Sequence, residues 1–258
     1  MKKTYSVLLK TIETICNDNL DEQTIRNNVI FYNKVMRELK DMSHETKYFY
    51  NELASKSYVR DYTLQNRFLF IESVIEKVSA EQFLEQGVDA VFEEKIKRHT
   101  PLMEKDGADL ALTKNNKVIL IGSGSIPITG IILNKKFGCK IVCVDLDIDA
   151  ITLSRKVIST LGLDSNFQFI CNDIKNIEPE NISNSTAVIT AFVQNKDQII
   201  KGFFNKCNNL NLLIRQPRGP YSLIYDKVDI NLLNKLESIQ IDDDLKRGHY
   251  CSVIGRIR

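Results

Sequence analysis

Apolar residues recur at three- and four-residue spacing through the first 112 residues, which is the period of an amphipathic helix. The series Leu8, Leu9 and Ile12 is one example. No glycine stands before Gly87 and no proline before Pro101, so little interrupts a helix in this stretch. The pattern predicts roughly four to six helices between residues 1 and 112.

Two of these helices carry start signals, one at Asp21-Glu22 and one at residues 43–45, which read Ser-His-Glu. A third, between Phe68 and Val78, is apolar over so much of its circumference that we expect it to be buried on most sides.

From residue 117 the pattern changes to short runs of β-branched residues that alternate with helical stretches. The predicted strands are 117–121, 140–145, 167–171, 186–191 and 211–215, and the predicted helices are 127–136, 149–160 and 195–206. Strands that alternate with helices predict a parallel, doubly wound sheet with right-handed crossovers. The last two elements, 233–241 and 249–254, flank a charged loop and predict a terminal antiparallel hairpin.

The chain is therefore expected to be an α/β protein with two domains. Residues 1–114 would form an N-terminal helical bundle that supplies a substrate-binding lid. Residues 115–258 would form a class I methyltransferase-like Rossmann domain.

Composition narrows the function classes. The chain has 35 Lys and Arg against 33 Asp and Glu, for a net charge of +2. This excess of positive charge is too small to indicate binding to nucleic acid or to an anionic membrane. No stretch approaches the roughly 20 apolar residues of a membrane span, and the basic start is followed by no secretory apolar region. We therefore expect a cytoplasmic protein.

The six cysteines and three histidines are scattered, so their spacing predicts neither a disulfide framework nor a metal site.

A glycine turn follows the first predicted strand directly. The segment 122–126 reads Gly-Ser-Gly-Ser-Ile and leads through Pro127 into a helix. Gly122 permits the tight turn, and Gly124 lets a ligand approach the backbone. The third glycine of the dinucleotide fingerprint is missing, which disfavours NAD or FAD. A plain turn is the alternative, but the context favours a cofactor-binding role for Gly122, Ser123 and Gly124.

Acidic residues follow the second and third predicted strands. Asp145 stands about 20 residues beyond Gly124, where a carboxylate can accept both ribose hydroxyls of a nucleoside. Asp173 stands where it can reach an adenine amino group. Each could instead cap a loop. Together with the glycine turn they predict a nucleoside pocket without a phosphate site, and S-adenosylmethionine fits that pocket best.

The same segments carry a family resemblance. Residues 122–129 read Gly-Ser-Gly-Ser-Ile-Pro-Ile-Thr, which resembles the Gly-Ser-Gly-Pro-Leu-Pro-Leu-Thr of the nicotianamine synthase family. Arg215, Gly219, Tyr225 and the pair Val228-Asp229 match that family's segment after the fifth strand. The apolar stretch that begins at Ala191 resembles the family's segment after the fourth strand and implies a cofactor-binding role for Ala191. In length and composition the chain is most similar to the staphylopine-type synthases of bacteria.

This resemblance implies an aminobutanoyl transfer rather than a methyl transfer. An amine would attack the methylene of the methionine arm of S-adenosylmethionine, which acts as co-substrate, and methylthioadenosine would leave. The implied acceptor is histidine, with D-histidine expected and L-histidine left open, and the product would be a metallophore precursor. The family also implies a homodimer. Gln216, Arg218 and Tyr221 depart from the plant pattern, which disfavours nicotianamine itself as the product.

The attacking amine must lose its proton, so a base is needed within reach. Glu72 and Glu76 are the catalytic candidates, because they lie one turn apart on an apolar helix that would raise the pKa of a buried carboxyl. The family carries two acids at this spacing on its corresponding helix, one of them catalytic. We favour Glu76; two solvated acids are the alternative.

The candidate substrate-binding residues are His99, Arg215, Arg218 and Tyr225. The two arginines could bind substrate carboxylates bidentately, and strand-end arginines that face solvent are the alternative. His99 stands where the resembled family often has a substrate-contacting tyrosine, and a surface or capping histidine is the alternative. Two other functions stay open: an S-adenosylmethionine-dependent small-molecule methyltransferase and a non-catalytic nucleoside-binding regulator.

Overall fold

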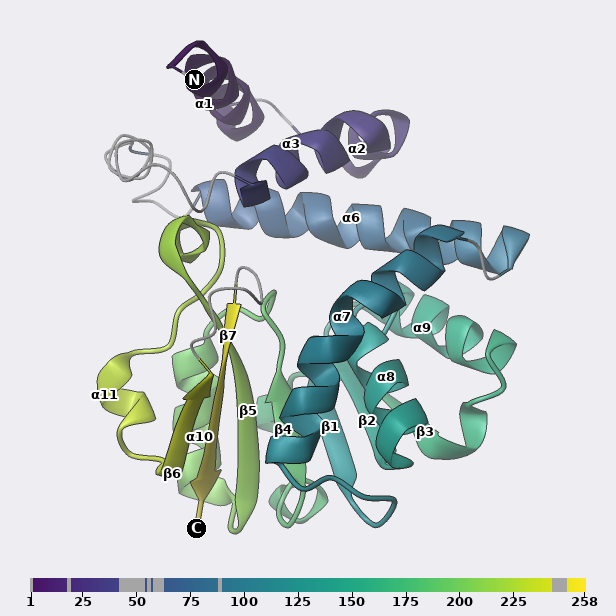
Figure 1. The fold of residues 1–258 in the computed structure, drawn as a ribbon, viewed down its shortest axis with the longest axis vertical. Helices are drawn as coiled ribbons and strands as arrows, with labels where there is room; N and C mark the ends of the chain where they lie inside the picture. The colour runs from purple at the N-terminus through teal and green to yellow at the C-terminus, as the bar shows by residue number, and fades with distance from the viewer. Residues whose placement is uncertain are drawn as a thin grey trace.

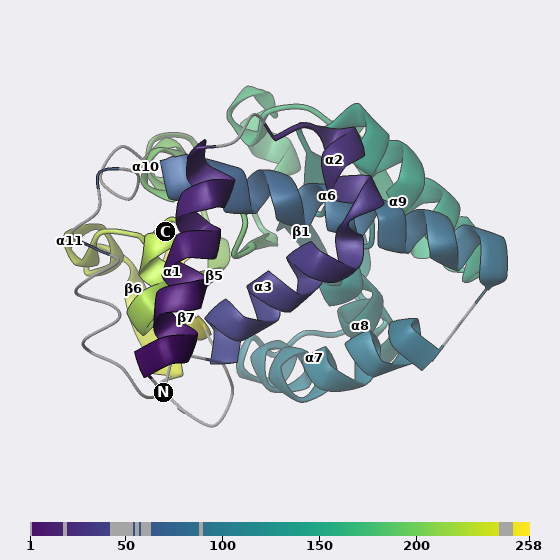
Figure 2. The same ribbon diagram turned by 90° about the horizontal axis from the view of Figure 1, so that it is seen from above.

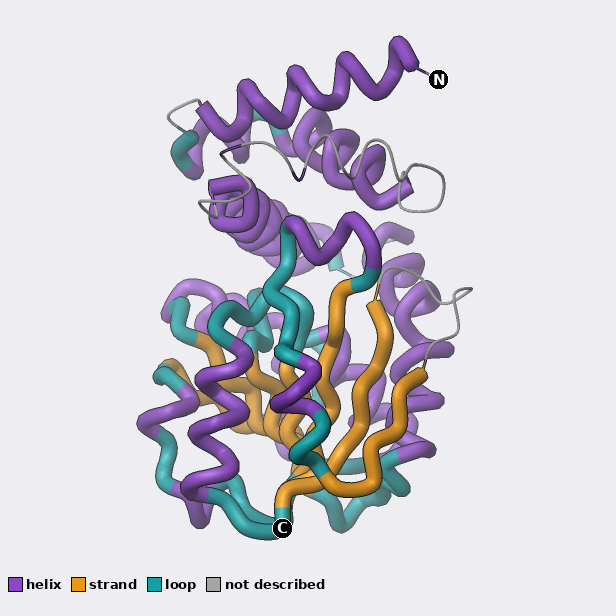
Figure 3. Tube along the Cα trace, turned by 90° about the vertical axis from the view of Figure 1, so that its left-hand side faces the viewer, coloured by secondary structure: helices purple, strands orange, loops and turns teal. Residues whose placement is uncertain are grey.

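A layer of helices lies across one end of a twisted sheet in the computed structural model of the protein (Figure 1). The structure describes residues 2–17, 20–41, 54, 57, 63–87, 90–242 and 250–258. The side view places this layer above the ends of the strands (Figure 3).

The helical layer consists of α1 (Lys2–Asn17), α2 (Glu22–Asn27), α3 (Val29–Asp41) and α6 (Thr63–Gln86) among the described residues. Seen from above, α1 and α3 cross over α6, which spans the top of the sheet (Figure 2). Helix α6 buries Phe68, Ile71 and Val74 against the other helices, as its broad apolar surface predicts. Tyr221 and Tyr225, from far along the chain, belong to the same apolar cluster.

Seven strands form a single sheet in the order β3-β2-β1-β4-β5-β7-β6. Their bounds are β1 (Lys117–Ile121), β2 (Lys140–Asp145), β3 (Phe167–Cys171), β4 (Thr186–Ile189), β5 (Leu210–Pro217), β6 (Glu237–Asp242) and β7 (Tyr250–Ile257). Strands β1 to β5 pair in parallel, whereas β7 pairs antiparallel with both β5 and β6. The central strands are apolar on both faces because helices cover both faces.

The covering helices are α7 (Ala90–Asp109), α8 (Ile128–Phe137), α9 (Ile148–Thr160) and α10 (Lys196–Lys206), with the single turn α11 (Ile230–Leu233) before β6. Short 3-10 turns η2 (Asp164–Asn166), η3 (Ile174–Asn176), η4 (Pro179–Asn181) and η5 (Gly219–Leu223) connect other elements. Gly107 lets α7 approach α8, because a Cβ there would lie 2.1 Å from the Phe137 ring.

The predicted fold class is confirmed: helices precede a methyltransferase-like sheet of five parallel strands and an antiparallel hairpin. Two of the predicted strands are shorter than expected. The strand predicted at 186–191 ends at Ile189, and the strand predicted at 233–241 begins only at Glu237. Leu233 instead ends a helical turn that Asp229 caps, since a buried apolar residue suits either element.

The predicted domain boundary at residue 114 lies in the loop between α7 and β1. Buried α7 residues such as Met103 nevertheless share an apolar cluster with β1 and α8. The helix start predicted at 43–45 lies outside the described residues. Within those residues, no helix has the length and apolar character that would let it span a bilayer.

Candidate functional site

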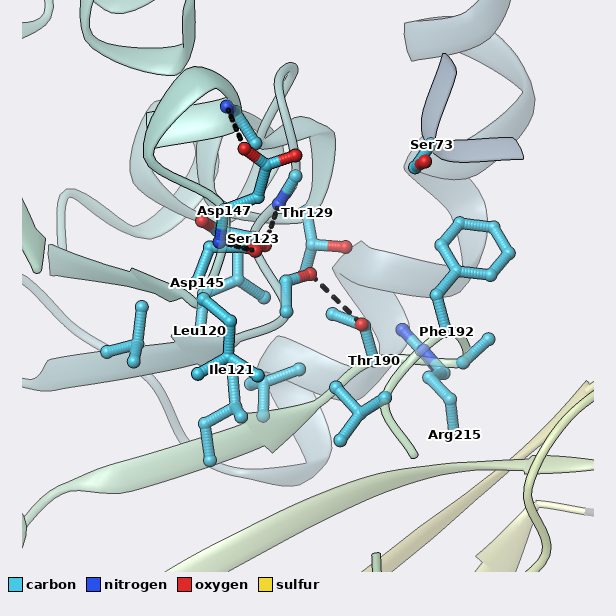
Figure 4. A pocket seen from close by; sticks show the side chains of 18 of the residues that line it. Ser73, Leu120, Ile121, Ser123, Thr129, Asp145, Asp147, Thr190, Phe192 and Arg215 are labelled. Carbon is cyan, nitrogen blue, oxygen red and sulfur yellow. Dashed lines mark hydrogen bonds between the residues drawn. The ribbon is translucent and has the colours of Figure 1, made fainter. Parts of the chain in front are cut away.

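A cavity of about 520 Å³ lies where the carboxyl ends of the parallel strands meet α6 and α7. This is where ligands bind in open α/β sheets, and the volume suits a small molecule. Figure 4 shows Asp145 and Asp147 on one side of the cavity and Phe192 and Arg215 on the other. Predicted site residues that line it are Glu72, Glu76, His99, Gly122, Ser123, Gly124, Asp145, Asp173, Ala191 and Arg215.

The glycine turn has the backbone conformation that the sequence predicts. Gly122 and Gly124 have φ values of +71° and +67°, in the region that favours glycine. A Cβ on Gly122 would lie 2.5 Å from Cγ2 of Val193, so this glycine allows the loop after β4 to approach. The Thr190 hydroxyl donates to the Gly122 carbonyl at 3.0 Å and fixes the same contact.

The group that approaches Gly124 is a side chain of the protein. A Cβ on Gly124 would lie 2.1 Å from Oε2 of Glu76, which comes from α6. The same oxygen accepts a hydrogen bond from the Ser125 backbone N–H at 3.2 Å. Gly124 therefore makes room for a carboxylate beside the turn, a role that its sequence position did not indicate.

The pKa of the Glu76 carboxyl lies near physiological pH. Burial raises its pKa from 4.5 to about 7. The Ser125 N–H lowers this pKa, Asp145 raises it, and Lys95 lowers it. A group with this pKa can take a proton from an ammonium and release it again near neutral pH.

Asp145 ends β2 and contacts the glycine turn directly. Its Oδ2 accepts from Gly124 N at 2.8 Å, and its Oδ1 accepts from Asp147 N at 3.1 Å. A carboxylate has about four lone-pair positions, so it can still accept ligand hydroxyls. Asp147 caps α9 and pairs at 2.8 Å with Lys77, the neighbour of Glu76 on α6. Two consecutive residues of α6 thus hold two adjacent loops of the sheet.

The other end of the nucleoside pocket lies after β3. Asp173 caps η3 through Lys175 N, and its other oxygen lies 3.2 Å from the Lys175 ammonium. Leu146, the residue after Asp145, lines the cavity with 73% of its surface exposed, so it offers an apolar surface to a ligand. An apolar surface and carboxylates in one cavity suit an adenine ring and a ribose.

The two acidic candidates on α6 have different surroundings. Glu72 accepts a hydrogen bond from the Tyr225 hydroxyl at 2.6 Å. The pKa of Tyr225 is raised well above its usual range, mainly by burial and next by the charge of Glu72. The Tyr225 ring packs against Phe192 and Tyr250, which line the cavity. Glu72 therefore contacts a cluster of aromatic rings through Tyr225, whereas Glu76 lies against the glycine turn.

His99 lines the cavity from α7. Its Nδ1 lies 2.8 Å from the Lys95 carbonyl. A carbonyl can only accept, so Nδ1 carries the proton and Nε2 is the acceptor in the neutral ring.

The two predicted arginines differ in position. Arg215 lines the cavity and pairs at 2.6 Å with Asp106 of α7, a carboxyl with no exposed surface. It also donates to Ser252 and to the Met103 sulfur. Arg218 is not among the cavity-lining residues; it donates to the Asp242 carbonyl at 2.7 Å.

The cavity is electrostatically negative. Among the described residues, the Lys and Arg side chains that line it each contact a carboxylate: Lys77, Lys175 and Arg215. Five carboxyl residues line the cavity, Glu72, Glu76, Asp145, Asp147 and Asp173, so carboxyls outnumber these three cations. Such a cavity favours a cationic ligand.

Sequence reasoning missed Ser125, Lys77 and Asp106. Ser125 contributes a backbone N–H, which no side-chain pattern reveals. Lys77 and Asp106 lie on helices where a charged residue is ordinary, and only their burial marks them.

The doubly wound sheet, its hairpin and the glycine turn define a class I methyltransferase-like Rossmann fold. A protein from Methanococcus maripaludis, described as an S-adenosylmethionine-dependent methyltransferase, shares this fold with a TM-score of 0.52 and 16% identity. That likeness covers 71% of this chain and 92% of that one.

The sequence model "Nicotianamine synthase protein" matches residues 102–254, which is more than half of the chain. The chain therefore belongs to the nicotianamine synthase family, as its motifs predict.

Solved structures of MtNAS extend the likeness to the helical layer. The structure of MtNAS in complex with MTA and tNA has a TM-score of 0.75 at 17% identity, covering 99% of this chain and 97% of that one. A mutant of MtNAS in complex with S-adenosylmethionine has a TM-score of 0.72 at 16% identity.

Curated relatives match a shorter segment. The L-histidine 2-aminobutanoyltransferase of Yersinia pestis is 43% identical over 56 residues, which is 22% of this chain and 21% of the relative. The enzyme of the same name from Pseudomonas aeruginosa strain UCBPP-PA14 is 30% identical over 53 residues. The chain thus matches about a fifth of the length of these relatives.

Proposed function

We propose that the protein transfers the 3-amino-3-carboxypropyl group of S-adenosylmethionine to the amine of histidine and releases methylthioadenosine. The observation that carries the proposal is the position of Glu76, a partly buried carboxyl with a pKa near 7 beside the glycine turn of a nucleoside pocket. A base at this place serves an amine nucleophile, and a pure nucleoside binder has no use for it.

The described residues fit S-adenosylmethionine as a substrate. Asp145 retains acceptor capacity for the ribose hydroxyls, and Asp173 and Leu146 suit the adenine. The negative cavity suits the sulfonium. The solved MtNAS structures with S-adenosylmethionine and with MTA, together with family membership, support the same ligand.

In the proposed reaction, the lone pair of the acceptor amine forms a bond to the methylene carbon next to sulfur in the methionine arm. The carbon–sulfur bond breaks, and its electron pair stays on sulfur in methylthioadenosine. The acceptor enters as an ammonium and gives its proton to Glu76 before attack. The positive charge passes from sulfur to the new secondary amine, which deprotonates afterwards.

Three residues that line the cavity form what we call its acceptor end, where the amine substrate would bind: His99, Glu72 and Arg215. His99 provides a hydrogen-bond-accepting nitrogen, Glu72 a carboxylate and Arg215 a guanidinium. This set can contact the amine, ring and carboxylate of histidine. The names of the Yersinia pestis and Pseudomonas aeruginosa relatives support histidine as the acceptor class. We expect histidine of D configuration, with L-histidine as the competing substrate.

The experiment is mass spectrometry of products formed from S-adenosylmethionine with D-histidine, L-histidine and a panel of other amino acids. We expect methylthioadenosine and a conjugate heavier than histidine by one aminobutanoyl unit. Activity should fall below about pH 7 as Glu76 becomes protonated. S-adenosylhomocysteine with a methylated acceptor would reject this proposal in favour of a methyltransferase, and no turnover would favour a nucleoside-binding regulator.

A further inference from the structure

A lysine outside the cavity holds three segments of the site together. Lys196 is the first residue of α10 and has no exposed surface. Its ammonium donates to the carbonyls of Ala191 at 3.1 Å, Arg215 at 3.0 Å and Asp226 at 2.9 Å. An ammonium has three N–H donors, so each donor has a backbone acceptor.

This position is unfavourable for a lysine on general grounds. The N-terminus of a helix carries a partial positive charge, and burial of a cation costs free energy unless the cation is well compensated. An apolar residue would avoid both of these costs but would leave the three carbonyls without this donor. The Asp226 carboxylate compensates in part and also accepts the Lys196 backbone N–H at 2.9 Å.

Two of the three carbonyls belong to residues of the cavity wall, and the third belongs to the residue after Tyr225. Ala191 and Arg215 line the cavity themselves. Asp226 follows Tyr225, whose hydroxyl donates to Glu72. One ammonium thus connects the loop after β4, the end of β5 and the segment that carries the tyrosine.

We propose that Lys196 is a positioning residue that sets the spacing of these three segments and thereby the fit of the acceptor. The proposal rests on the proposed function for the identity of the acceptor. Lys196 does not line the cavity, so its effect passes through the backbone of residues that do. A displacement of about 1 Å at a reacting centre can cost about 100-fold in rate.

The geometry has a consequence at alkaline pH. Burial lowers the pKa of Lys196 from 10.5 to about 8, and Asp226 is the charged group that raises it. The neutral amine has two N–H donors, so deprotonation leaves one of the three carbonyls without its partner. Activity should therefore decline reversibly above about pH 8.

Stability should move in the opposite direction over the same range. Between pH 8 and 10.5 the unfolded chain holds a proton that the folded protein has released at Lys196. The contribution of this group to the free energy of unfolding therefore rises with pH in that window. Loss of activity without loss of stability separates a positioning role from a general structural one.

The test compares Lys196→Met with Lys201→Met, an exposed lysine on the same helix. Steady-state kinetics with histidine should show kcat/KM for the acceptor lowered about 10–100-fold in Lys196→Met, and unchanged in the control. Calorimetry should show unchanged affinity for methylthioadenosine, which lacks the amino-acid arm. A folded Lys196→Met variant with wild-type kcat and KM would overturn the proposal, as would an equal loss of methylthioadenosine binding and turnover.

The wild-type pH profile decides the matter if Lys196→Met does not fold. A reversible decline above about pH 8 with an undiminished melting temperature supports the proposal, and a flat profile to about pH 9.5 overturns it. Release of S-adenosylhomocysteine by the wild type would reject the proposed function but not the role of Lys196. The same variants would then be compared on the methyl transfer.

Discussion

Replacement of Glu76 by glutamine should make the protein less active and more stable at the same time. A pKa raised from 4.5 to about 7 means that the folded state binds the proton more tightly than the unfolded chain does. Stability therefore falls as pH rises through this window, and the full cost, roughly 3 kcal/mol, is present above pH 7. Glutamine has no charge to bury and can still accept from Ser125 N.

The assay is denaturant or thermal unfolding of Glu76→Gln and wild type at pH 8 and at about pH 4.5. We expect the variant to melt on the order of 5–10 °C higher at pH 8, with a much smaller difference at the acidic pH, where Glu76 is protonated. Turnover should drop roughly 10²–10⁴-fold because the proton acceptor is lost. Glu85→Gln, an exposed site on the same helix, should change neither quantity.

If Glu76 is the proton acceptor, the gain in stability and the loss of turnover appear together in Glu76→Gln. A variant that is no more stable than wild type at pH 8 would mean that Glu76 is not a buried, destabilised carboxylate. A variant that is stabilised but fully active would move the base to Glu72, and Glu72→Gln would then abolish turnover.

Three further variants test the rest of the site. Asp145→Ala should weaken S-adenosylmethionine binding by about 1–3 kcal/mol in calorimetry, through loss of charge-assisted hydrogen bonds; unchanged affinity would remove it from the site. Gly124→Ala should cost activity about 100-fold or more because its Cβ would displace the proposed base, whereas Gly162→Ala, at a similar φ of +68° with open space around it, should remain active. Tyr225→Phe should raise the acceptor KM several-fold by freeing Glu72, and an unaltered KM would separate this pair from recognition.

Much of the fold follows from local pattern. The strands at 117–121, 140–145 and 167–171 have the predicted ends because β-branched runs bounded by polar turns leave little choice. The strand at 186–191 was predicted too long because Thr190 and Ala191 suit a strand as well as a cavity wall. Both residues instead lie in the loop after β4 and line the cavity. This loop approaches Gly122 through Val193, which is a tertiary contact that the local sequence does not indicate.

The candidate site divides in a similar way. That Gly122, Gly124 and Asp145 line the cavity could be predicted, because their place depends on position relative to a strand end. Arg218 stays a prediction as a substrate ligand: it is not among the cavity-lining residues, and its guanidinium donates to the Asp242 backbone carbonyl on the neighbouring hairpin. Alternation along an extended chain turns such neighbours to different surroundings.

Buried charges were the residues that sequence could not reveal. Lys196 and Asp106 occur in segments where charged residues are common, so their identity gives no sign that they lie inside the protein. Only the assembled fold brings three carbonyls to one ammonium and a guanidinium to one carboxylate.

The contact between Tyr225 and Glu72 joins residues 153 positions apart, and Tyr221 and Tyr225 complete the apolar cluster of the first helices. During synthesis on a ribosome, α6 emerges long before the segment that finishes its core and fixes its acidic face. The helical layer therefore cannot reach its final packing until Tyr221 and Tyr225 have been made. A product that ends before them would keep the glycine turn and Asp145 but would lack the tyrosine that donates to Glu72.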